Sequence, residues 1–164
     1  MGDNVEKTQK TKKRVNLINS ENNKIYKKQN LVTLIDSENI SHTKADKIKK
    51  IIKSQGNSIE IYIYAMQNDN ATAKWHDEAK QNNWKEKRLS GEREKNKVDN
   101  KIIKDCMQIL ENNKSADIFT ICTSDNDYIP IIEELRKSSK KVILICEKKA
   151  SDKLRKAASK VFEI

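Results

Sequence analysis

Four aspartates are placed where their carboxylates could share a divalent cation. Asp36 ends the apolar run LVTLID, Asp125 and Asp127 follow the run ADIFTICT, and Asp99 lies near the start of a predicted helix. In open parallel α/β sheets, ligands bind beyond the carboxyl ends of the strands, so these side chains are expected to meet. Carboxylates crowded into one cleft repel one another, and a cation that prefers oxygen ligands relieves that repulsion. The pattern therefore predicts a Mg²⁺ or Mn²⁺ site.

The helix that begins at Val98 carries an aspartate on its apolar face. With Val98 at zero, the apolar side chains fill an arc of roughly 20° to 180°, and Asp99 falls within it at roughly 100°. Asp105 falls at roughly 340°, at the border with the polar arc. A buried carboxylate without a partner is costly, so a compensating cation is expected. The alternative is that Asp99 only favours the positive end of the helix dipole and points partly to solvent.

Other metal and redox chemistries have little support in the sequence. The histidines, His42 and His76, are not at ligand spacing to any cysteine, which argues against zinc. Cys106, Cys122 and Cys146 lie far apart in apolar segments and are predicted to be core residues in a reducing compartment. No stretch approaches the roughly 20 apolar residues of a membrane-spanning helix, and the polar N-terminus lacks a signal-peptide run. We therefore expect a cytoplasmic protein without a membrane partner.

Predicted strands and helices alternate along the chain, with linkers too short for hairpins between successive strands. This order favours right-handed βαβ units with helices on the faces of the sheet. The expected fold is an α/β three-layer sandwich with a central, mainly parallel sheet of about five strands. The expected strands cover residues 31–36, 58–66, 116–123, 141–147 and 161–164, and the helices 43–55, 71–81, 98–113, 125–139 and 151–159, with a short strand near residue 84 left open.

Local signals mark the ends of two of these helices. Thr43 followed by Asp46 is typical of a capping box, and Gly56 is a typical C-terminal stop for the same helix. Pro130 lies in the first turn of the helix after Asp127, where proline is tolerated. These signals support a helix between each pair of neighbouring strands.

The net charge of +10 is concentrated at the N-terminus. Residues 1–30 hold 8 basic and 3 acidic side chains, out of 34 and 24 in the chain of 164 residues, so half of the net charge lies there. Such asymmetry indicates a polyanion as partner, and a Lys- and Asn-rich bias that only keeps the protein soluble explains it as well. We expect residues 1–30 to form a basic, flexible arm and residues 31–164 to form one folded domain.

Three segments are similar to a known family. IDSENI at 35–40, KVDNKIIKDCMQIL at 97–110 and TSDNDYIPIIEELRKSSKKVILI at 123–145 resemble the NYN domain branch of the PIN-like, flap-endonuclease-related ribonucleases. The most specific part is TSDNDYIP, because S-D-x-D-[FY]-x-P directly after an apolar strand is rare. The sequence departs from the family at Ser139, where relatives place a glycine between helix and strand. A left-handed serine there costs about 1 kcal/mol.

The resemblance implies a metal-dependent ribonuclease that hydrolyses RNA phosphodiester bonds with Mg²⁺ or Mn²⁺. It also implies that Asn39 is positioned beside the first aspartate and that Ser124 touches a phosphate or orients Asp125. Asp105 matches a further family aspartate, and its place on the helix predicts that it supports the ligands without binding the metal. The implied catalytic residues and metal ligands are Asp36, Asp99, Asp125 and Asp127.

A basic segment before the Asp99 helix is expected to line the path of a single-stranded or structured RNA. Two tryptophans nearby, Trp75 and Trp84, could stack on unpaired bases, and packing in the core explains them equally well. A solvated surface is the simpler explanation for any of the cations. The cations assigned to substrate binding are Lys85, Lys87, Arg88 and Arg93.

Two other functions stay open on the sequence alone. A binding module of the same fold would hold RNA without cutting it, and the retained aspartates argue against this reading. A Toprim-like enzyme also carries a D-x-D at a strand end, but its first acid is a glutamate, and Glu38 lies past the end of the strand. The sequence also leaves open a homodimer or a regulatory protein partner.

Overall fold

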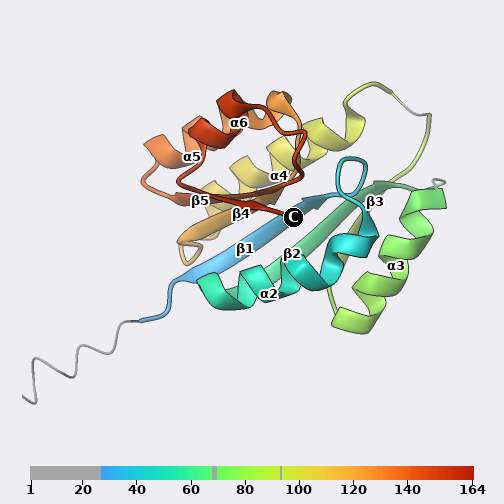
Figure 1. Ribbon diagram of the computed structural model, residues 1–164, viewed down its shortest axis with the longest axis horizontal. Helices are drawn as coiled ribbons and strands as arrows, with labels where there is room; N and C mark the ends of the chain where they lie inside the picture. Colours follow the sequence, from blue (N-terminus) through green and yellow to red (C-terminus); the bar gives the residue numbers. More distant parts are fainter. Residues whose placement is uncertain (1–26, 68–69, 93) are drawn as a thin grey trace, which may run out of the picture.

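The sheet is built from short apolar and β-branched segments, and the central ones are buried on both faces. This computed structural model describes residues 27–67, 70–92 and 94–164, so nearly all of the predicted basic arm lies outside the described residues. Within these ranges, six parallel strands lie in the order β3-β2-β1-β4-β5-β6 (Figure 1). The strands are β1 (Asn30–Asp36), β2 (Asn57–Met66), β3 (Lys85–Leu89), β4 (Ile118–Cys122), β5 (Lys141–Cys146) and β6 (Lys160–Glu163).

Helices cover both faces of the sheet and confirm the predicted three-layer α/β sandwich (Figure 1). The sheet has six strands because the segment after Trp84, which the sequence left open, forms the edge strand β3. No helix in the described ranges is both long and apolar enough to cross a bilayer. The helices are α2 (Ala45–Gln55), α3 (Asn70–Asn82), α4 (Lys97–Asn112), α5 (Ile129–Lys137) and α6 (Asp152–Ala157), with short 3-10 helices η1 (His42–Lys44) and η2 (Asn126–Tyr128).

Alternating side chains of β1 separate the two apolar cores. Leu31 and Ile35 face the core under α2 and α3, whereas Val32 and Leu34 face the core under α4, α5 and α6. This period of two follows from the pleat of the strand. The three cysteines are free and buried, so their predicted core positions are confirmed.

Two helix ends depend on features other than those expected. The capping box at Thr43 was a wrong prediction, because the Ser41 hydroxyl accepts from the Thr43 amide at 3.4 Å and caps η1 instead. Helix α2 then begins at Ala45 without a side-chain cap. After α5, Ser139 has φ 60°, the left-handed conformation that a glycine adopts more easily.

Gly56 lets the start of the domain lie close to β2. It is the C-cap of α2, so the predicted helix stop is confirmed, and its φ of −174° is extended backbone. A Cβ added to Gly56 would lie 2.7 Å from the Gln29 carbonyl oxygen, which accepts a hydrogen bond from the Asn57 amide at 2.8 Å. The glycine is therefore needed for close approach, and it fixes where the chain enters β1.

Two buried hydroxyls lie side by side in the centre of the sheet. Thr33 of β1 and Thr120 of β4 are register partners, and within the described ranges neither hydroxyl has a hydrogen-bond partner. Thr123, just past the end of β4, is equally buried, but its hydroxyl donates to Asp36 at 3.2 Å and accepts from the Asp125 amide at 3.2 Å. The three threonines thus differ in hydrogen bonding and not in burial.

Replacing the unpartnered hydroxyls should stabilise the fold. A buried polar group without a partner costs roughly 1–3 kcal/mol, so Thr33→Val and Thr120→Val should each raise the free energy of unfolding by about 1 kcal/mol. The matched control, Thr123→Val, should lower it because two hydrogen bonds are lost. Urea unfolding measures all three. A loss of stability in both Thr33→Val and Thr120→Val would contradict the expectation.

Candidate metal centre

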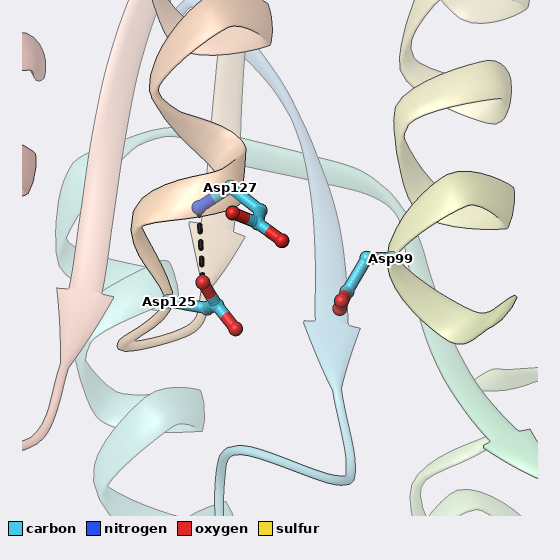
Figure 2. Close-up of side chains that lie close together, drawn as sticks. All are labelled: Asp99, Asp125 and Asp127. Carbon is cyan, nitrogen blue, oxygen red and sulfur yellow. Dashed lines mark hydrogen bonds between the residues drawn. The ribbon is translucent and has the colours of Figure 1, made fainter. Parts of the chain in front are cut away.

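Three carboxylates meet at the carboxyl-terminal edge of the sheet. Figure 2 shows Asp99 reaching from α4 toward Asp125 and Asp127 of the η2 segment. One oxygen of each lies within 4.8 Å of the other two. Asp99 is buried, Asp125 is half-buried and Asp127 is exposed, so the group opens to solvent on one side.

The S-D-x-D spacing folds into a turn stabilised by side-chain hydrogen bonds. Asp125 is the N-cap of η2, with φ −93° and ψ 137°, and its carboxylate accepts from the Asp127 amide at 2.9 Å. The Thr123 hydroxyl accepts from the Asp125 amide at 3.2 Å. From the start of α4, the Asn96 side-chain amide donates to Asp127 at 3.2 Å. These contacts fix both carboxylates of the turn relative to β4 and α4.

Asp36 is fully buried beside this group, and its carboxylate accepts four hydrogen bonds. Its Oδ2 atom accepts from the side chains of Asn39 at 2.6 Å and Thr123 at 3.2 Å, and the Tyr128 hydroxyl lies 3.1 Å from the same atom. Its Oδ1 atom accepts from the amides of Glu38 and Asn39 at 3.1 and 3.3 Å. The structure therefore places Asp36 beside the three grouped carboxylates and not among them.

The Tyr128 hydroxyl connects Asp36 to the group. It lies 2.9 Å from Asp99 Oδ1 and 3.1 Å from Asp36 Oδ2, and the side chain is fully buried. The sequence reasoning assigned no role to this hydroxyl, although Tyr128 stands within the TSDNDYIP motif. The signal that could have found it is the aromatic residue directly after the second aspartate.

Burial and like charges act together on these acids. Loss of solvent raises the pKa of Asp36, against the hydrogen bonds from Asn39, Tyr128, Glu38 and Thr123, which lower it. Loss of solvent likewise raises the pKa of Asp99; the Tyr128 hydrogen bond opposes this rise, and the charges of the other three aspartates add to it. Crowded oxygen donors of this kind fit a hard divalent cation such as Mg²⁺ or Mn²⁺, which Asp99, Asp125 and Asp127 could hold.

Three further residues were expected near the metal, and each has different hydrogen-bond partners. Asn39 holds Asp36 through its side-chain amide. The Ser124 hydroxyl accepts from the Glu147 amide at 3.0 Å and so fastens the end of β4 to the segment after β5. Asp105 lies on another side of α4, where it accepts from Tyr64 at 2.9 Å and from Lys101 at 2.6 Å.

The three described cations among those assigned to RNA binding do not lie on one face of β3. Lys85 and Lys87 lie on the same face of β3, each with its ammonium 5.4 Å from the centre of the Tyr62 ring. Arg88 points to the opposite face, because side chains alternate along a strand, and pairs with Glu86 at 2.7 Å. Lys85 also pairs with Glu60. Arg93 lies outside the described residues.

A polar cavity lies beside the loop that follows Asp36. It holds about 320 Å³ and is lined by residues 37–42 after β1, by Trp75, and by Glu147 and Lys149 after β5. Asn39 is shared between this cavity and the hydrogen bonds of Asp36. Trp75 is 1% exposed and donates to the Ile40 carbonyl at 3.0 Å, so its main role is packing.

Comparisons with known proteins identify the family and support the fold. The family model described as NYN domain matches residues 30–164. A search of curated protein sequences finds no match. Among solved structures, a protein of unknown function from Vibrio parahaemolyticus has a TM-score of 0.70 and 17% identity, covering 84% of this chain and 94% of its own. A suggested oxidoreductase from Parabacteroides merdae has a TM-score of 0.44 and 12% identity, covering 84% of this chain and 32% of its own.

The raised pKa values of Asp36 and Asp99 predict how the metal-free protein responds to pH. A group whose pKa rises on folding stabilises the protein below its unfolded pKa, and this contribution is lost as the pH rises through the folded pKa. Both carboxyls should therefore stabilise the fold at about pH 4 and lose that effect toward neutrality. Asp99→Asn removes one of the charges and should raise the melting temperature at pH 7 in the presence of a chelator.

Thermal unfolding at several pH values tests this expectation. Asp99→Asn should also show a weaker dependence of melting temperature on pH than the wild type. The control is Asp46→Asn, an exposed aspartate in the first turn of α2 that is not one of the grouped carboxylates. A lower melting temperature for Asp99→Asn at pH 7, with chelator present, would show that the buried charge is not destabilising.

Proposed function

This chain belongs to the NYN domain family of PIN-like nucleases, and from that premise we propose that it is a metal-dependent ribonuclease. The observation that carries the proposal is the grouping of Asp99, Asp125 and Asp127, whose oxygens approach within 4.8 Å of one another. Carboxylates so close to each other, with one of them buried, are arranged to bind a cation. Membership of the family makes nucleic acid the substrate class, and RNA is our proposal within it.

The proposed Mg²⁺ or Mn²⁺ ligands are Asp99, Asp125 and Asp127. Asp36 is a fourth carboxylate beside them. When bound, such cations activate water as the nucleophile and neutralise charge on the phosphate. The protein's own part is to hold the carboxylates in place, through the η2 turn and the hydrogen bonds to Asp36. Asp105 has no described hydrogen bond to the three grouped carboxylates, and we propose that it orders α4 by bonding to Tyr64 and Lys101.

We propose that the cavity of residues 37–42, Trp75, Glu147 and Lys149 receives the nucleotide next to the scissile phosphate. It shares Asn39 with the site and lies at the edge of the sheet where open α/β folds bind ligands. The exposed Lys149 ammonium supplies a cation for a backbone phosphate. Lys87 and Lys85, on the face of β3 toward Tyr62, are proposed to contact RNA farther from the site.

Membership of the NYN family removes the support for the Toprim-like alternative. In the structure, the acid at the end of β1 is Asp36, and Glu38 lies beyond the strand. A binding module without cleavage activity has no observation in its favour here, and it is one of the outcomes of the cleavage experiment below.

Removing single ligands should abolish cleavage while leaving the fold intact. With single-stranded RNA and Mn²⁺, Asp99→Asn and Asp125→Asn should each cut at least about 100-fold more slowly than wild type, because a metal ligand is lost. Asp46→Asn serves as the control and should cut at the wild-type rate. The measurement is the cleavage rate of labelled RNA, with DNA of the same sequence and a chelator in parallel.

The outcomes of this experiment separate the candidate functions. Undiminished cleavage by Asp99→Asn and Asp125→Asn would refute the ligand assignment. A wild type that binds RNA and Mn²⁺ but cuts neither RNA nor DNA would be a binding module. Cleavage of DNA and not of RNA would contradict the proposed substrate.

The cavity assignment predicts a difference between two neighbouring lysines. Lys149→Ala should weaken binding to RNA of every sequence and reduce the slope of log Kd against log salt by about 1, because one phosphate contact is lost. Lys148→Ala is the matched control, since Lys148 is equally exposed but does not line the cavity. Both are measured in the Asp125→Asn background, which keeps the RNA intact. If the two variants changed RNA binding equally, the proposal that the cavity receives the substrate would be wrong.

A further inference from the structure

Tyr128 belongs to the η2 segment, and its hydroxyl contacts an aspartate that lies on a different helix, α4. Asp125 and Asp127 belong to this segment, whereas Asp99 comes from α4, far away in sequence. The Tyr128 hydroxyl lies 2.9 Å from Asp99 Oδ1. This bond joins the segment that carries two of the grouped carboxylates to the helix that carries the third.

One proton limits what this hydroxyl can do. A tyrosine hydroxyl donates a single hydrogen bond, yet two carboxylate oxygens lie within reach, on Asp99 and on Asp36. Asp36 accepts four other hydrogen bonds, from Asn39 twice, Glu38 and Thr123. In the described part of the chain, Tyr128 is the one group that donates to Asp99. The shorter distance and the shortage of donors both direct the proton to Asp99.

We infer that Tyr128 is a positioning residue, whose hydroxyl holds the Asp99 carboxylate at the spacing from Asp125 and Asp127 that a divalent cation requires. The ring is fully buried and the residue directly follows Asp127, so the hydroxyl moves little relative to the η2 carboxylates. The bond opposes the repulsion that would otherwise turn Asp99 away from the other acids. Groups that orient metal ligands through hydrogen bonds affect metal affinity strongly. This inference rests on the proposed metal-dependent function.

The protein contains a matched comparison for this hydrogen bond. The Tyr64 hydroxyl donates to Asp105 at 2.9 Å, the same distance as between Tyr128 and Asp99. Both tyrosines are fully buried, and both acids are buried residues of α4. Only Asp99 belongs to the grouped carboxylates. The two tyrosines therefore separate an effect on the metal site from the general effect of losing a buried hydroxyl.

The experiment measures Mn²⁺ binding by calorimetry in the absence of RNA. Tyr128→Phe keeps the ring and removes the hydroxyl, and it should weaken Mn²⁺ binding about 10- to 100-fold. Tyr64→Phe should bind Mn²⁺ as the wild type does. In the cleavage assay, Tyr128→Phe should need more Mn²⁺ for half-maximal activity and should approach the wild-type rate when Mn²⁺ saturates. Thermal unfolding with chelator checks that both variants fold.

Each result either supports or overturns the inference. Weaker binding in Tyr128→Phe alone supports it. Unchanged or tighter binding in Tyr128→Phe overturns it and leaves the proposed function intact. Equal weakening in both variants, or a failure to unfold cooperatively in Tyr128→Phe alone, assigns the hydroxyl to folding and also overturns it. A wild type that does not bind Mn²⁺ overturns the inference together with the proposed function.

Discussion

Asp36 and Asp99 are buried carboxylates whose charges repel each other, and the Tyr128 hydroxyl lies between them. Such acids stay buried only when donors or a cation compensate for lost solvent. For Asp36 the donors come from the loop after β1 and from the end of β4, and the Tyr128 hydroxyl of the η2 segment lies 3.1 Å away. The same hydrogen bonds that make the charge tolerable therefore also align the elements that carry the other acids. Stability and the arrangement of the site depend on one network.

The positions of the acids followed from the sequence because they depend on local patterns. A β-branched run that ends at Asp36, and another followed by Asp125 and Asp127, put three carboxylates at one edge once the strands are parallel. The helical arc placed Asp99 toward the core, and the structure buries it. Asp105 is buried too, although it was expected only at the border of the arc. The pattern gave the direction of Asp105 on the helix, but it did not predict that the neighbouring Tyr64 hydroxyl donates a hydrogen bond to it.

The features that the sequence did not predict depend on which helices and strands are neighbours in space. The bridging role of Tyr128 requires α4 to lie over the end of β1, and no local pattern records that. Lys87 and Arg88 lie on opposite faces of β3 because side chains alternate along a strand. The sequence of β3 is mostly charged, so it predicted a strand only weakly. Gly56 is the C-cap of α2, as the sequence predicted, but no local pattern showed that the Gln29 carbonyl, 27 residues earlier in the chain, also requires a glycine there.

The close approach of Gln29 to Gly56 also fixes the edge of the sheet at which the described chain enters β1. It fastens the chain at the amino-terminal edge of the sheet, and the aspartates lie at the carboxyl-terminal edge (Figure 1). The 7 residues of β1 separate these two edges by about 20 Å. The point where the described chain enters β1 therefore lies about 20 Å from the carboxylates, at the opposite edge of the sheet.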